Sequence, residues 1–143
     1  LFGENTAGEA MAMTTPVITT VREDGDSTSM SFVLPSKYGL ETAPRPKTSD
    51  ISLEEVPPVT VAAIEFPGFA TKEEVVRQRE TLLRGLQAKG WVRDESTALS
   101  VTVLQYNAPY TLPTVRRNEV LIKLDEGWIA PAAEGGDAVG AVV

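Results

Sequence analysis

The side chains best suited to chemistry gather in one stretch near the end of the chain, from Tyr106-Asn107-Ala108-Pro109 to Arg116-Arg117-Asn118-Glu119-Val120. This stretch combines aromatic and apolar side chains with two adjacent cations and a carboxylate. The candidate ligand-binding residues are Tyr106, Pro109, Tyr110, Leu112, Arg116, Arg117 and Glu119. Such side chains can hold a ligand through apolar contact and charge-assisted hydrogen bonds. Together they do not form a catalytic signature.

The sequence contains neither cysteine nor histidine. Without cysteine there is no disulfide, thiolate nucleophile or zinc-thiolate site, and without histidine the usual general base and the commonest metal ligand are missing. The chain also has no Gly-x-Ser-x-Gly elbow, no P-loop and no dinucleotide fingerprint. We therefore assign no catalytic or metal-binding residues, and the sequence gives no support for an enzyme while leaving that question open.

Length and charge narrow the class of protein further. The 143 residues are enough for one domain with its own core, and 42% of them are hydrophobic. The net charge of -7 disfavours nucleic acid as a main partner, because phosphate binding needs clustered cations. No apolar run is long enough to span a membrane, and the first residues do not form a signal peptide. We expect a soluble globular chain.

Residue patterning predicts the elements that must position these side chains. Strands are expected over 11–22, 28–34, 51–56, 59–66, 98–106 and 119–124, and one helix over 72–89. The acidic turn at 23–26 predicts a hairpin between the first two strands. The segment 35–49 carries three prolines and a glycine, so it is expected to be a surface connection. Residues 59–66 are expected to form a buried strand.

The helix has clear start and stop signals. Thr71 is a good N-cap, Glu74 lies three residues later as in a capping box, and Gly90 suits the C-terminal stop. An apolar stripe expected to pack on the sheet contains Val75, Val76, Leu82, Leu83 and Leu86. On the second strand Met30, Phe32 and Leu34 share one face, which we expect to lie in the core.

Several segments, taken in order, resemble the SOUL family of haem-binding proteins. They are Gly3-Glu4-Asn5, Met13-Thr14-Thr15-Pro16-Val17, Met30-Ser31-Phe32-Val33-Leu34-Pro35, Pro44-Arg45-Pro46, Phe66-Pro67-Gly68-Phe69-Ala70, Tyr106-Asn107-Ala108-Pro109 and Arg116-Arg117-Asn118-Glu119-Val120. No single motif is specific, but their order and spacing cover the chain to about Leu124. The resemblance implies a domain over 1–126, followed by an Ala- and Gly-rich tail over 127–143.

The resemblance also implies an α+β fold: a distorted antiparallel β-barrel of two pseudo-repeats, each with a long helix packed on it. GyrI-like effector-binding domains share this architecture. In the family, a first strand and a first helix precede the position of Gly3, and this chain begins after them. Without them the barrel is expected to have an open edge, which invites pairing with another chain.

In well-known haem binders of the family, the first helix and the loop before the last strand form the porphyrin cleft. In this chain Tyr106, Pro109, Tyr110, Leu112 and Pro113 can supply the apolar wall of that cleft. Arg116 and Arg117 can supply cations for the propionates. Covering roughly 300 Å² of apolar ligand surface gains about 7 kcal/mol at about 25 cal/mol per Å², against association costs of about 4 to 15 kcal/mol. Axial ligation would strengthen such binding, and the side chains able to provide it are Tyr110, Tyr38 and Met13.

Structural roles compete with ligand binding at the same residues. Successive strand positions face opposite sides, so at most one of Arg116 and Arg117 can face a given cleft, and the other is expected to form a cross-strand ion pair. Asn118 suits hydrogen bonds to a turn or to backbone. Glu119 suits an ion pair with an arginine on the strand, although GyrI-like domains place an acidic residue comparably in a pocket for cationic aromatic ligands.

Three functions therefore stay open. The first is a carrier or buffer of haem or a related tetrapyrrole, with arginine contacts to the propionates and no histidine ligation. The second is a non-catalytic accessory or interaction subunit of a larger assembly, with a protein partner at the open edge or at the tail. The third is an effector-binding or hydrolytic pocket centred on Glu119. The chain most resembles plant and algal members of the family, which implies the chloroplast, with the cytoplasm as the alternative.

Overall fold

A computed structural model of the chain describes residues 5–8, 10–21, 28–91 and 101–124. It is an α+β structure of antiparallel strands and one long helix. The elements in chain order are β1 (Val17–Val21), β2 (Thr28–Phe32), β3 (Val61–Phe66), α1 (Lys72–Ala88), β4 (Val101–Gln105), the short 3-10 helix η2 (Pro113–Val115) and β5 (Asn118–Lys123).

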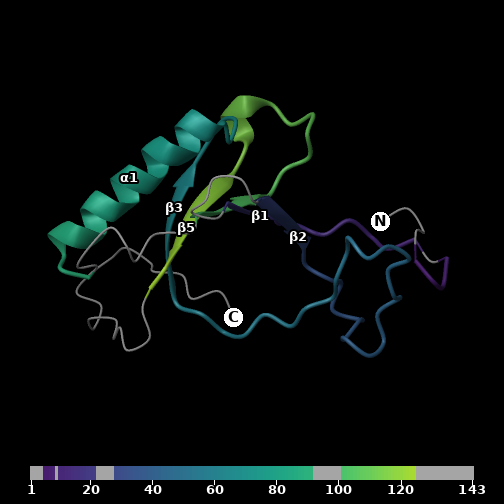
Figure 1. Cartoon of the computed structure of the whole chain (residues 1–143). Helices are drawn as coiled ribbons and strands as arrows, with labels where there is room; N and C mark the ends of the chain where they lie inside the picture. Colours follow the sequence, from purple (N-terminus) through teal and green to yellow (C-terminus); the bar gives the residue numbers. More distant parts are fainter. Residues whose placement is uncertain (1–4, 9, 22–27, 92–100, 125–143) are drawn as a thin grey trace.

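The strands form one antiparallel sheet in the order β2-β1-β4-β5-β3. At its centre β1 pairs with β4, with Thr19 opposite Val103. The hairpin partner β2 flanks β1 on one side, and β5 and β3 follow β4 on the other. Figure 1 shows the strong twist between the β1–β2 end and the steeply inclined β3 and β5. Within the described residues this sheet is open, so the predicted distorted barrel of two pseudo-repeats is not confirmed.

The helix α1 begins and ends as its sequence predicts. Thr71 caps the N-terminus, where its hydroxyl accepts a hydrogen bond from the Glu74 amide at 3.3 Å. Gly90 has φ +69°, which favours glycine, and the amides of Gly90 and Trp91 donate to carbonyls of the last turn at 2.9 Å. The second half of the predicted capping box is not formed, because the Thr71 amide donates to the Phe69 carbonyl at 2.9 Å and the Glu74 carboxylate binds Arg77 and Gln78 instead.

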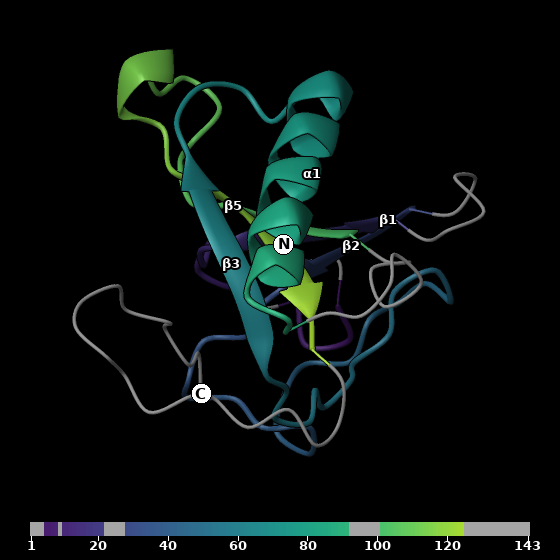
Figure 2. The same cartoon turned by 90° about the vertical axis from the view of Figure 1, so that its left-hand side faces the viewer.

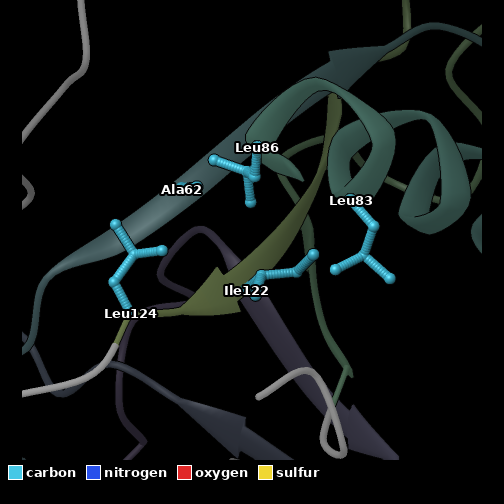
Figure 3. Packing of buried hydrophobic residues seen from close by; sticks show 5 residues of the cluster. All are labelled: Ala62, Leu83, Leu86, Ile122 and Leu124. Atoms are coloured by element: carbon cyan, nitrogen blue, oxygen red, sulfur yellow. The ribbon is translucent and has the colours of Figure 1, made fainter. Parts of the chain in front are cut away.

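The helix packs along β3 and β5, on one face of the sheet (Figure 2). Two clusters of apolar side chains fill this contact. The first cluster consists of Ala62, Leu83, Leu86, Ile122 and Leu124, shown in Figure 3. The second consists of Phe66, Val103 and Val120, with Val75 of the helix packed against it. The strand residues of both clusters alternate along β3, β4 and β5, so the intervening residues face away from the helix.

Some expectations for strands and core are wrong. Residues 51–56 form no strand, because two prolines follow directly and this segment runs as an extended connection into β3. The strand β3 is not buried on both faces, since Ala63 and Glu65 are exposed between its buried positions. Met30 and Phe32 are exposed, because α1 covers only the β3–β5 end of the sheet. Val76 is also exposed, on the flank of the helical stripe.

Other expectations are confirmed, and some fall outside the described residues. Residues 35–49 form turns and one isolated bridge, as expected of a surface connection. The strands predicted over 11–22, 28–34, 98–106 and 119–124 exist within shorter or slightly shifted limits. The turn at 23–26, the first residues of the strand predicted from 98, and the tail at 127–143 lie outside the described residues. Among the described helices, none is long and apolar enough to cross a membrane.

Candidate functional site

The candidate site lies where the chain leaves β4 and returns in β5, in the loop of residues 107–117. At the base of the loop, the last residue of β4 pairs with the first residue of β5, Gln105 opposite Asn118. Just beyond this pair, the Tyr106 amide donates to the Arg117 carbonyl at 3.3 Å. The Arg117 amide donates to Asn107 Oδ1 at 2.6 Å. These bonds fix both ends of the loop on the rigid central strands.

Arg116 braces the interior of this loop. Its Nε donates to the Thr111 carbonyl at 2.9 Å, and its Nη2 donates to the Pro109 carbonyl. Its guanidinium also stacks on the Phe69 ring, with Cζ 4.5 Å from the ring centre. Arg116 thus ties the loop to itself and to the segment between β3 and α1. Because two of its donor nitrogens serve the backbone, Arg116 acts as a brace, and a ligand anion would have to compete with these bonds.

Asn118 connects the loop to the β3–α1 turn. Its side-chain amide is buried and donates to the carbonyls of Phe66, at 3.3 Å, and Gly68, at 3.0 Å. The Gly68 amide in turn donates to the Pro113 carbonyl at 2.9 Å. Gly68 has φ +89°, a conformation that a side chain would strain. The predicted role of Asn118, hydrogen bonding to a turn and to backbone, is confirmed.

A charged network of four side chains, Tyr106, Glu119, Arg117 and Glu65, lies on the sheet face that points away from α1. Glu119 and Glu65 are directly opposite each other on β5 and β3. The Arg117 guanidinium binds both carboxylates, with Nη2 2.5 Å from Glu119 Oε1 and Nε 2.9 Å from Glu65 Oε2. The Tyr106 hydroxyl donates to Glu119 Oε2 at 2.9 Å, and the same guanidinium stacks over the Tyr106 ring at 4.5 Å. Without the arginine, the two facing carboxylates would repel each other.

Burial divides this network into an inner and an outer part. The side chain of Glu119 is 10% exposed, whereas those of Arg117 and Glu65 are 53% and 62% exposed. Burial and the hydrogen bond to Glu119 raise the pKa of Tyr106 above its ordinary value, which keeps the phenol protonated as a donor. The hydrogen bond to Glu119 raises the pKa of Arg117. The Tyr106–Glu119 bond is therefore the inner part, and the Arg117–Glu65 pair is the outer part.

The tip of the loop carries large apolar side chains in solvent. Tyr110 is 90% exposed, Leu112 70% and Val115 64%. Phe69, on which Arg116 stacks, is also exposed. Large apolar side chains held in water by a braced loop are typical of a binding surface. Figure 1 shows that the loop projects from the end of the sheet beside the N-terminus of α1.

The structure sorts the predicted site residues into three groups. Tyr106, Arg117 and Glu119 meet in the charged network, so the predicted cross-strand ion pair of one arginine and the predicted arginine partner of Glu119 are both confirmed. Tyr110 and Leu112 are exposed at the tip, with Pro109 next to them. Arg116 braces the loop from within. Ligand contact by these residues stays a prediction.

Sequence reasoning missed Glu65 and Phe69. Glu65 interrupts an apolar strand on the face opposite the helix, and this interruption was a signal for a polar partner across the sheet. Phe69 follows a turn, where nothing in the sequence indicates contact with residue 116. Among the axial-ligand candidates, Met13 is exposed and the Tyr38 ring lies under Lys37 Nζ at 4.6 Å. No group of three His, Cys, Asp or Glu side chains within the described residues is arranged to hold a metal ion.

The comparison with known families gives one clear result. Residues 1–123 match the family described as "SOUL heme-binding protein", which is most of the chain and includes the whole loop and charged network. No curated protein matches the sequence significantly. The family match agrees with the resemblance carried by the sequence motifs.

Proposed function

The chain belongs to the SOUL haem-binding family, and on this premise we propose that it binds haem or a related tetrapyrrole on the loop of residues 107–117 and acts as a carrier or buffer. The observation that carries this proposal is the set of exposed apolar side chains, Tyr110, Leu112 and Val115, on a loop braced by Arg116. A braced surface loses little conformational freedom when a flat ligand covers it, which favours affinity.

The residues present fit a porphyrin through apolar contact and one cation. A porphyrin is a flat apolar disc with two carboxylates, and the loop tip offers apolar side chains within the same segment as Arg117. Arg117 is half-exposed and can receive a propionate, whereas the guanidinium of Arg116 is used by backbone carbonyls and by Phe69. Our proposal therefore assigns the propionate contact to Arg117 and involves no histidine ligation.

A haemin titration tests this function. Binding of haemin to the chain is followed by the Soret band and by tryptophan quenching. Replacing Leu112 with serine removes an exposed aliphatic contact at the tip and weakens binding about fivefold, which corresponds to about 1 kcal/mol of apolar burial. The matched control is Ile51→Ser, which removes an equally large exposed side chain from the connection that enters β3 at the end opposite the loop. Equal affinities of both variants and the parent chain for haemin would show that haemin does not bind on this loop.

The open edge of the sheet supports a second candidate function, that of an interaction subunit. Thr19 and Val103 face each other on β1 and β4. Met30 of β2 pairs with Thr19, and Val120 of β5 pairs with Val103, so Met30 and Val120 hold equivalent positions on either side of the β1–β4 pair. Val120 is fully buried in the cluster on which Val75 of α1 packs, whereas Met30 is 62% exposed. We infer that a protein partner covers β2 and Met30 in the way that β3 and α1 cover β5 and Val120.

A pull-down and a measurement of the oligomeric state test this second function. Met30→Lys places a charge on the apolar face of β2 and should abolish association if a partner covers this face. Thr102→Lys is a control on the opposite sheet face, in the central strand β4. An unchanged set of associations in Met30→Lys would argue against an interaction subunit that uses this edge.

The third candidate function is an effector-binding or hydrolytic pocket centred on Glu119. Glu119 is buried and already accepts hydrogen bonds from Tyr106 and Arg117, which favours a structural carboxylate over an effector-binding or hydrolytic one. Loss of ligand binding in Glu119→Gln, with an unchanged melting temperature, would favour the pocket.

For the compartment we propose the chloroplast, and a fluorescent fusion of the full-length protein distinguishes it from the cytoplasm.

A further inference from the structure

The outer carboxylate of the charged network stands where a ligand carboxylate would bind. Glu65 Oε2 lies 2.9 Å from Arg117 Nε, and both side chains are more than half exposed. The Arg117 guanidinium is the cation to which the proposed function assigns the propionate. A carboxylate of the protein therefore occupies Nε of a guanidinium that is more than half exposed. It must leave before a carboxylate from solution can bind at the same nitrogen.

The two carboxylates on Arg117 differ in how readily they can be replaced. Glu119 is buried and is held by the Tyr106 hydroxyl as well as by Arg117. Within the described residues, Glu65 has Arg117 as its ion-pair partner and is otherwise turned to water. An exposed ion pair contributes little stability, whereas a buried charge stripped of its partners is costly. Glu65 is thus the carboxylate that a ligand can displace.

The rest of the network keeps the cation in place when Glu65 leaves. The bond from Arg117 Nη2 to Glu119 and the stacking over Tyr106 are independent of Glu65. The guanidinium therefore stays in place when Glu65 leaves, and its Nε is then no longer bound to a carboxylate of the protein. A preoriented planar cation above an aromatic ring suits the carboxylate of a flat ligand.

We propose that Glu65 is an internal competitor of the ligand: it occupies the carboxylate position at Arg117, and it lowers the affinity for tetrapyrroles that carry free carboxylates without affecting those that carry none. This inference rests on the proposed haem-binding function. Glu65 then makes the site discriminate against tetrapyrroles with free carboxylates. Removing the Glu65 carboxylate should raise the affinity for these anionic ligands alone. Glu65 acts here through Arg117 and is a specificity-determining residue.

The experiment compares three proteins with two ligands. The proteins are the parent chain, Glu65→Gln and the control Glu80→Gln, which removes the same charge from an exposed pair with Arg84 on α1. The ligands are haemin and haemin dimethyl ester, in which both carboxylates are methylated. Glu65→Gln should lower the Kd for haemin about two- to fivefold, the range of an exposed ion pair, and leave the Kd for the ester unchanged. Glu80→Gln should change neither value.

Two results would overturn this inference alone. Either haemin binds to the parent chain and to Glu65→Gln with the same affinity, or Glu65→Gln binds both ligands more tightly by the same factor. If no haemin binds to any of the three proteins, the proposed function fails and the inference fails with it. Equal melting temperatures of the three proteins show that the affinities compare folded chains.

Discussion

Arg117 holds two facing carboxylates together, and its replacement by glutamine should destabilise the domain in a way that a second change partly repairs. Glu65 and Glu119 lie directly opposite each other on β3 and β5, with the guanidinium bound to both. In Arg117→Gln the buried Glu119 loses its charge-assisted hydrogen bond, and the two carboxylates face each other without a cation. The double variant Arg117→Gln/Glu65→Gln removes the repulsion between the carboxylates, but Glu119 still lacks its hydrogen bond from Arg117.

The expected loss follows from the burial of each contact. A hydrogen bond to the largely buried Glu119 carboxylate contributes about 1.5 to 3 kcal/mol. The exposed pair with Glu65 adds about 0 to 1 kcal/mol, and the two like charges left facing each other cost up to about 1 kcal/mol. Arg117→Gln should therefore lower the free energy of unfolding by about 2 to 4 kcal/mol. The double variant should recover about 0.5 to 1 kcal/mol of this loss.

Urea unfolding at neutral pH measures these differences, with a melting curve as a second readout. For a domain of this size, 1 kcal/mol corresponds to about 3 °C in Tm, so Arg117→Gln should melt about 6 to 12 °C lower. Arg84→Gln is the matched control, because its pair with Glu80 is exposed and long, at 3.9 Å. The reasoning is refuted if Arg117→Gln costs no more than this control, or if the double variant is less stable than Arg117→Gln.

Three further predictions concern the turn bound by Asn118, the phenol of Tyr106 and the C-terminus of α1. Asn118→Ala removes two hydrogen bonds to backbone carbonyls and should cost about 2 to 3 kcal/mol in urea unfolding; a loss below about 0.5 kcal/mol would show that they do not hold the turn. The pKa of Tyr106 is raised, so its contribution to stability is present below about pH 10 and is lost as pH rises through the pKa of the folded state. An ultraviolet titration should accordingly show a late-ionising phenol that Tyr106→Phe removes, and the same curve in both proteins would contradict this assignment. Gly90→Ala should cost about 1 kcal/mol, since the residue has φ +69°; an unchanged Tm would contradict this conformation.

The helix and the central strands could be predicted well from the sequence, because residues close together in the chain determine where these elements form. Thr71 and Gly90 mark the ends of α1 through capping geometry that depends only on nearby residues. The prediction failed where neighbours in space decide the outcome. Alternation along β2 is the same whether or not a helix covers it, so Met30 and Phe32 could not be recognised as exposed. The 51–56 segment has a strand-like pattern, but two prolines follow it directly, and the segment forms no strand.

The candidate site shows the same division. Its residues could be selected from the sequence because aromatic, proline and arginine residues are concentrated in one loop. Their roles could not be assigned, because Arg116 and Arg117 are alike in sequence and differ only in what they reach. Arg116 turns into the loop toward backbone carbonyls, and Arg117 reaches across to Glu65, whose position depends on the pairing of β3 with β5. The strand register and the path of the loop thus decide that Arg116 braces the loop and that Arg117 is the cation available to a ligand.

The most direct test of the central claim is a nuclear magnetic resonance titration of the chain with zinc protoporphyrin, a diamagnetic tetrapyrrole. If the ligand lies on the loop of residues 107–117, the largest shift changes will occur at the backbone amides of Tyr110, Leu112 and Val115, with smaller changes at Arg117. Shift changes centred on α1 or on β2, with those of the loop amides unmoved, would contradict the account.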